Sequence, residues 1–67
     1  MKVLITGASS YVGARIYFDL KDKYDLIGTY FNNPLSRLFF RLDLSNKDEV
    51  QQFFEEKKPD IIVHVAN

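Results

Sequence analysis

Runs of apolar residues separated by polar turns predict four short strands. Residues Lys2–Thr6 and Ile61–Val65 are nearly continuous apolar runs rich in β-branched side chains, a pattern typical of strands buried on both faces. Asp25–Tyr30 and Leu38–Leu42 are two further strand candidates, and Asn32-Asn33-Pro34 ends the earlier of them. The segments between these strands have a different periodicity.

The first connecting segment has helical spacing. From about Tyr11 to Lys23, residues Val12, Ile16 and Leu20 recur at intervals that place them on one face of a helix. We therefore expect a helix here, with that face packed against the strands.

A second helix is predicted after Ser45. This residue is expected as the N-cap, and Asp48 three positions later gives an approximate capping box. The helix should run to about Lys58, because Pro59 cannot continue it. One stripe of this helix contains Val50, Phe53, Phe54 and Lys57.

The resulting order is β-α-β-β-α-β, and strands that alternate with helices favour parallel pairing with right-handed crossovers. The predicted fold class is α/β, with half of a Rossmann-type doubly wound parallel sheet and the strand order 3-2-1-4. A half-sheet leaves its last strand as an edge with an apolar face. We therefore expect residues 1–67 to be the N-terminal segment of a longer chain. Otherwise a partner, such as the second copy in a homodimer, should cover that edge.

The composition is that of a globular protein without a nucleic-acid or metal partner. Hydrophobic residues make up 46% and charged residues 27% of the chain. The 9 basic and 9 acidic residues cancel, which leaves no electrostatic footprint for nucleic acid or an acidic membrane. Cysteine is absent, and the single histidine, His64, cannot form a metal site alone.

The sequence also predicts a cytoplasmic protein with no membrane partner. The apolar residues after Met1 stop at Gly7, short of the roughly 7–15 residues of a secretory core. No run approaches the ~20 apolar residues that a membrane-spanning helix needs.

The segment Thr6–Gly13 carries the main chemical signal. It follows a strand and opens a helix, which is the setting of a dinucleotide-binding fingerprint. Gly7 permits a tight turn, the small Ser10 lets backbone N–H groups approach a pyrophosphate, and Gly13 lets the helix lie close to the strand. The helix N-terminus adds unpaired N–H groups and the positive end of the helix dipole. The alternative is that both glycines serve the turn and the packing alone.

Three segments together resemble a known family. They are Thr6–Gly13 (TGASSYVG), Leu42–Leu44 (LDL) and Pro59–Asn67 (PDIIVHVAN). This combination resembles the N-terminal part of the extended short-chain dehydrogenases/reductases, and most of all the dTDP-4-dehydrorhamnose reductase group. The extended pattern has glycines at positions 7, 10 and 13 and the single-domain branch at 7, 11 and 13, whereas this chain has Ser10 and Tyr11. The early end of the fourth strand favours the extended branch.

The resemblance implies contacts with a dinucleotide cofactor at three places. Backbone contacts with the pyrophosphate would come from Ser10, Tyr11 and Val12. The adenine edge would be held by Asp43 and Leu44, with the carboxylate accepting a hydrogen bond from the exocyclic amine. The ribose and nicotinamide side would be lined by Val65, Ala66 and Asn67.

The tip of the second strand bears on the choice of nicotinamide cofactor. An acidic residue there would bond the ribose 2′-hydroxyl and favour NAD, but the segment Thr29–Asn33 contains none. Arg37 or Arg41 could supply a cation for a 2′-phosphate. We therefore favour NADP(H) over NAD(H) and place Tyr30 among the cofactor-binding residues. The alternative is that Tyr30 belongs to an ordinary loop and that both cofactors bind.

No catalytic residue is expected within this sequence. The resemblance implies a Tyr-x-x-x-Lys pair, which Tyr17 and Lys21 match by spacing alone. They belong to the first helix, away from the carboxyl ends of the strands where ligands bind. His64, in an apolar strand, is more typical of a hydrogen-bonded structural histidine. Asp43 also has a plain alternative role, as a turn residue before the second helix.

Two hypotheses of different classes follow. The first is the NAD(P)-binding portion of an oxidoreductase that reduces a keto group of a nucleotide-linked sugar, with the substrate held by residues outside this sequence. An extended-type epimerase or dehydratase is the alternative among enzymes. The second is a non-catalytic NADP(H)-binding regulatory subunit on the same fold. A Tyr-x-x-x-Lys pair further along the chain would separate the two, and a structural remnant that binds nothing is a third possibility.

Overall fold

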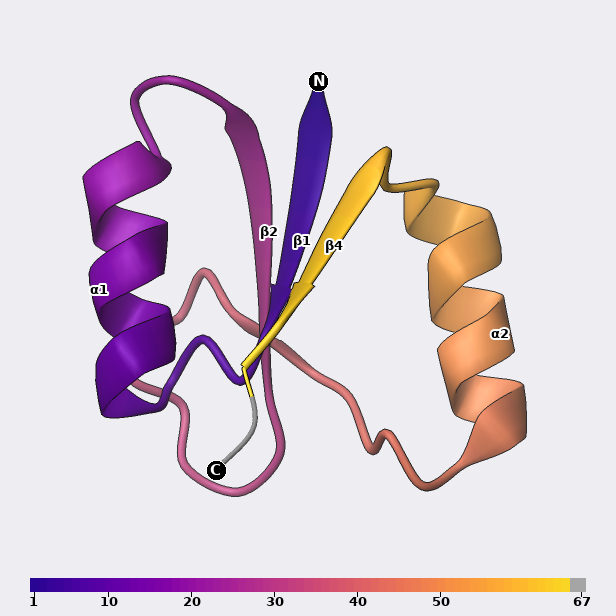
Figure 1. The fold of residues 1–67 in the computed structure, drawn as a ribbon. Coiled ribbons are helices and arrows are strands. Elements are labelled where there is room, and N and C mark those ends of the chain that lie inside the picture. Colours follow the sequence, from indigo (N-terminus) through magenta and orange to yellow (C-terminus); the bar gives the residue numbers. More distant parts are fainter. Residues whose placement is uncertain (66–67) are drawn as a thin grey trace.

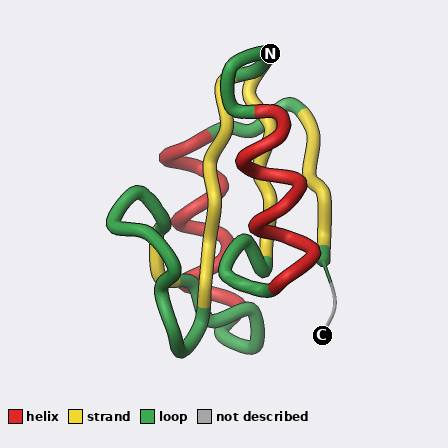
Figure 2. The backbone as a smooth tube through the Cα atoms, turned by 90° about the vertical axis from the view of Figure 1, so that its left-hand side faces the viewer, coloured by secondary structure: helices red, strands yellow, loops and turns green. Residues whose placement is uncertain are grey.

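The computed structural model describes residues 1–65 and contains a parallel sheet between two helices (Figure 1). In chain order the elements are β1 (Lys2–Thr6), α1 (Tyr11–Leu20), β2 (Asp25–Tyr30), β3 (Phe40–Arg41), α2 (Lys47–Lys57) and β4 (Ile61–His64). The strand order is β3-β2-β1-β4, and all neighbouring strands are parallel. The predicted α/β class and the order 3-2-1-4 are therefore confirmed. Helix α1 covers one face of the sheet and α2 lies on the other, as Figure 1 and the turned view in Figure 2 show.

Strand β1 lies at the centre of the sheet and of the core. Leu4 is in register with Ile27 of β2, and β4 pairs along the other edge of β1. Leu4 and Ile5 are both 0% exposed, which explains why this strand is continuously apolar. On the α1 side, the rings of Tyr17 and Phe39 meet edge to face with their centroids 4.8 Å apart.

Helix α1 differs from its prediction in length and in the face that it buries. It ends at Leu20 rather than near Lys23, and in the turn that follows, the N–H groups of Lys23 and Tyr24 both donate to the Leu20 carbonyl. Its buried residues are Gly13, Ala14 and Tyr17. Val12, expected on the buried face, is instead 56% exposed. The shift is consistent with a close approach of the helix backbone at Gly13, which has no side chain to keep it away.

Strand β3 is shorter than the predicted segment Leu38–Leu42. It consists of 2 residues. The residues before it form a turn, in which the N–H groups of Leu38 and Phe39 donate to the hydroxyl and the carbonyl of Ser36, respectively. These bonds keep the backbone of Leu38 and Phe39 out of the sheet, although the ring of Phe39 still lies in the core.

The start of α2 lies one residue later than predicted. Asn46, not Ser45, is the N-cap, and its Oδ1 accepts a hydrogen bond from the N–H of Glu49 at 3.1 Å. The carboxylate of Glu49 in turn accepts from the N–H of Asp43 at 3.2 Å, which makes a widened capping box. Ser45 lies in the turn before the helix, where its hydroxyl donates to the carboxylate of Asp43.

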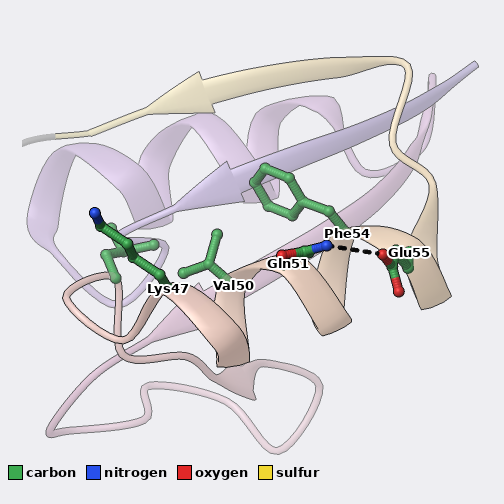
Figure 3. Close-up of a pocket in the computed structure, with 6 residues that line it drawn as sticks. Lys47, Val50, Gln51, Phe54 and Glu55 are labelled. Carbon is green, nitrogen blue, oxygen red and sulfur yellow. Dashed lines mark hydrogen bonds between the residues drawn. The ribbon is translucent and has the colours of Figure 1, made fainter.

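Helix α2 has no buried residue of its own. It ends at Lys57 and β4 ends at His64, each one residue before its prediction. A cavity of about 490 Å³ runs along the helix, and Figure 3 shows Val50 and Phe54 pointing from the helix into this space, toward the strands. Neither helix in the described part of the chain is long and apolar enough to cross a membrane.

Candidate functional site

Two adjacent cavities lie at the edge of the sheet where the parallel strands end. The larger, about 420 Å³, includes the predicted site residues Gly7, Tyr30, Asp43, Leu44 and Val65 in its lining. The smaller, about 260 Å³, lies between the glycine turn and the residues after β2, and its lining shares Gly7 and Tyr30 with the larger cavity and adds Ser10. The carboxyl edge of a parallel sheet is where open α/β folds bind their ligands.

The glycines of the turn are required by close backbone approaches. Gly7 has φ +70, and a Cβ added there would lie 2.6 Å from the Val65 carbonyl oxygen at the end of β4. A Cβ at Gly13 would lie only 2.0 Å from the carbonyl oxygen of Gly7. Both positions therefore exclude a side chain, and the turn stays narrow enough for its backbone to face a ligand.

Ser10 caps α1 with both its hydroxyl and its backbone. Its Oγ donates to the Gly7 carbonyl at 2.7 Å and accepts from the N–H of Gly13 at 3.0 Å. The N–H of Ser10 also donates to the Gly7 carbonyl. Within residues 1–65 the N–H groups of Tyr11 and Val12 have no hydrogen-bond partner. Of the three residues predicted to meet the pyrophosphate through backbone, Tyr11 and Val12 thus keep unpaired donors at the positive end of the helix.

The loop after β2 is tied to the glycine turn. The N–H of Leu35 donates to the hydroxyl of Ser9 at 2.9 Å. This bond keeps the loop beside the smaller cavity, whose lining includes Phe31, Asn32 and Asn33. Neither Ser9 nor Phe31 was predicted from the sequence as a site residue. Two sequence signals could have indicated these residues: Ser9 is a hydroxyl residue within the glycine turn, and Phe31 is an aromatic residue directly after a strand.

Asp43 belongs to the turn before α2 and also lines the larger cavity. Its Oδ1 accepts hydrogen bonds from the hydroxyl of Ser45 at 2.6 Å and from the Ser45 N–H at 3.0 Å. These bonds stabilise the carboxylate and lower the pKa of Asp43 below its ordinary value of 3.8. Asp43 and the exposed Leu44 also line the larger cavity, so the turn residue stands where the adenine contact is predicted.

The end of β4 is held to β1 beside the larger cavity. The Nδ1 of His64 lies 2.7 Å from the Oγ1 of Thr6, and the N–H of Val65 donates to the Thr6 carbonyl at 3.2 Å. His64 thus has the hydrogen-bond partner expected of a structural histidine. The remaining predicted contacts, Ala66 and Asn67, lie outside the described residues.

Catalytic and metal-binding groups were not predicted for this sequence. The ring of Tyr17 is buried with Phe39 in the core, so its match with Lys21 is a matter of spacing alone. Within residues 1–65, no cluster of three or more histidine, cysteine, aspartate or glutamate residues is placed to hold a metal ion.

The parallel sheet, the glycine turn between β1 and α1, and the cavities at the carboxyl edge define a Rossmann-like half-domain. The family comparison agrees with this class. The model of the NAD dependent epimerase/dehydratase family matches residues 3–67, and the chain belongs to this family. The resemblance to extended short-chain dehydrogenases/reductases is thereby confirmed.

Named relatives match 98% of this chain and extend well beyond it. A GDP-6-deoxy-D-talose 4-dehydrogenase from Aggregatibacter actinomycetemcomitans is 34% identical over 98% of this chain and 21% of its own length. A hypothetical dTDP-4-dehydrorhamnose reductase from Sulfolobus tokodaii superposes with a TM-score of 0.84 at 30% identity, over 98% of this chain and 24% of its own. L-threonine dehydrogenase from Clostridium difficile gives a TM-score of 0.79 at 25% identity, with the same two coverages of 98% and 24%. The chain thus spans less than a quarter of the length of each relative.

Proposed function

We propose that this chain is the cofactor-binding N-terminal segment of an NAD(P)-dependent oxidoreductase. The observation that carries the proposal is the pair of unpaired N–H groups at Tyr11 and Val12, beside a narrow glycine turn and two cavities at the carboxyl edge of the sheet. Unpaired donors at a helix N-terminus suit the pyrophosphate of a dinucleotide. The adenine would lie against Asp43 and Leu44, and the nicotinamide side would approach Val65, Ala66 and Asn67.

We propose a keto group of a nucleotide-linked sugar as the substrate. Two of the relatives carry names of enzymes that act on such sugars, and they support this choice. When bound, the cofactor supplies the hydride from C4 of its nicotinamide. The chain's own residues would hold and orient it, while acid catalysis and sugar binding would come from further residues of a longer chain. An epimerase or dehydratase is the second candidate, favoured by the description of the family.

NADP(H) is the favoured cofactor in this proposal. The residues around the tip of β2 that line the smaller cavity are Tyr30, Phe31, Asn32 and Asn33, and none is acidic. A 2′-phosphate would therefore meet no carboxylate there. We also propose a cytoplasmic protein, with a homodimer as the simplest way to cover apolar surface that the chain leaves exposed.

The proposal is tested by measuring NADPH and NADH binding to the protein by calorimetry. Asp43→Asn should weaken the binding of both about tenfold or more, because it removes a charged acceptor for the adenine amine. Asp48→Asn is the matched control, since Asp48 is exposed in the first turn of α2 and lines neither cavity. Absence of binding, or equal affinities for Asp43→Asn and the control variant, would contradict the assigned site. Transfer of hydride to a keto-sugar nucleotide by the full-length protein tests the reaction itself.

A further inference from the structure

Pairing of β2 with β3 brings a guanidinium group over an aromatic ring beside the candidate site. Tyr30 of β2 is in register with Arg41 of β3, and Phe31 follows directly. The Cζ of Arg41 lies 5.1 Å from the centroid of the Phe31 ring. A cation at this distance over a ring face is attracted by the negative potential of that face. The ring therefore favours one position of a long and otherwise mobile side chain.

The donors of Arg41 are not used within the described residues. Ion pairs in residues 1–65 join Arg15 to Asp19 and Lys21 to Asp22, and neither involves Arg41. A guanidinium carries five N–H donors in a planar fork that matches a phosphate. Stacking on a ring occupies its face and leaves the donors at its edge available.

Phe31 connects this arrangement to the site. Its side chain is 48% exposed, and it lines both the larger and the smaller cavity. The other cation near the loop, Arg37, makes no ion pair or aromatic contact within residues 1–65. Arg41 is thus the cation that the structure holds against a residue of the cavity wall.

We propose that Arg41 binds a phosphate monoester at the 2′ position of the adenosine ribose, and that Phe31 is the positioning residue for its guanidinium. This inference rests on the proposed function and assigns its cofactor preference to two residues. A 3′-phosphate on adenosine has the same chemistry, so the test has to separate the two positions.

Binding is measured by calorimetry on the full protein with NADPH, NADH and three fragments: adenosine 2′,5′-bisphosphate, adenosine 3′,5′-bisphosphate and adenosine 5′-monophosphate. NADPH and the 2′,5′-bisphosphate should bind about tenfold or more tightly than the ligands without the 2′-phosphate. Arg41→Gln should remove this preference and leave the affinity for adenosine 5′-monophosphate within about twofold. That unchanged affinity shows that the variant is folded. Arg37→Gln is the matched control and should keep the preference.

Phe31 is tested by a conservative pair of variants. Phe31→Leu should reduce the preference for the 2′-phosphate severalfold, and Phe31→Tyr should retain it, because tyrosine keeps the ring face and leucine does not. A merely structural role in the loop would not distinguish the two in this way.

The outcomes separate this inference from the proposed function. If NADPH and NADH bind but Arg41→Gln keeps the preference, or Arg37→Gln loses it, the assignment of Arg41 is wrong and the proposed function stands. Equal binding of the 2′,5′- and 3′,5′-bisphosphates also overturns the assignment. Binding of none of the five ligands overturns the proposed function and this inference together.

Discussion

The two faces of the sheet are packed to very different degrees. On the α1 face, the helix lies against β1 and β2, and its residue Tyr17 joins Val3 and Ile5 in a buried cluster. On the α2 face, the helix has no buried residue, and Ile62 of β4, which is in register with Leu4 of β1, is 47% exposed. The same type of element, a helix that connects two parallel strands, thus has buried residues on one face of the sheet and none on the other.

The difference follows from the residues at each helix surface. The backbone of α1 approaches the glycine turn at Gly13, where no side chain intervenes. Helix α2 meets the sheet through large groups at its rim, where the Lys57 ammonium lies 4.2 Å from the Phe40 ring centroid and Phe53 packs edge to face on Phe40. The glycine turn and its cavities are therefore supported by closely packed residues, whereas the α2 face leaves apolar surface for further contacts.

We expect the largest difference in the free energy of unfolding between substitutions of two residues that are in register across β1 and β4. Leu4, which is 0% exposed, is in register with Ile62. Leu4→Ala should lower the free energy of unfolding by about 2–5 kcal/mol, since it opens a cavity in the core. Ile62→Ala should cost about 1 kcal/mol or less, because half of its surface is already in water. Urea unfolding followed by circular dichroism measures both, and equal losses would show that Ile62, at the β4 edge of the α2 face, is packed as tightly as Leu4.

A second test concerns the close approach of α1 to the turn. Gly13→Ala should lower the free energy of unfolding by about 1–3 kcal/mol or more, since the added Cβ meets the carbonyl oxygen of Gly7. Gln51→Ala on the exposed surface of α2 should change it by no more than about 0.5 kcal/mol. The same denaturation experiment compares them. A tolerated alanine at position 13 would mean that the backbone of α1 can move away without cost.

The two N-caps allow a smaller and more direct comparison. Ser10→Ala removes a hydroxyl that both donates to Gly7 and accepts from Gly13, and should cost about 1–2 kcal/mol. Asn46→Ala removes one accepted bond at the exposed start of α2 and should cost about 0.5–1 kcal/mol. Hydrogen exchange of the first amides of each helix locates the loss. A larger loss of stability in Asn46→Ala than in Ser10→Ala would contradict the expectation that the cap of α1 is the stronger one.

The element order and the glycine turn could be predicted because they depend on local patterns. Continuous apolar runs mark the central strands, and Gly7 and Gly13 mark positions where backbone approaches backbone. The cap of α2 could not be predicted in the same way, because Ser45 and Asn46 are neighbours and both residue types are good caps, and only the structure shows that Asn46 accepts from the N–H of Glu49. Sequence spacing also could not place Val12 outside the core, since this depends on how closely the helix approaches the turn.

The contact between Arg41 and Phe31 shows a further limit of sequence reasoning. The two residues are ten positions apart and meet only because β2 and β3 pair in one particular register. From the sequence, Arg41 and Arg37 are equivalent candidates for a cation near the site. The register of the strands supplied the missing information.

We expect the smallest effect from a change in the pKa of Asp43. This residue lies between β3 and α2, in the wall of the larger cavity. Its pKa is lowered below 3.8, first by the Ser45 hydroxyl and then by the Ser45 N–H. A depressed pKa in the folded protein means that this carboxylate stabilises the fold above about pH 3.8, and that the contribution is lost as the pH falls through the folded value. Ser45→Ala should raise the pKa of Asp43 toward 3.8, and the remaining N–H should keep it slightly below. Carboxyl chemical shifts in an NMR titration measure both values. A wild-type pKa at or above 3.8 would show that the bonds from Ser45 do not hold the carboxylate of Asp43. The turn before α2 would then be as loosely held as the α2 face of the sheet.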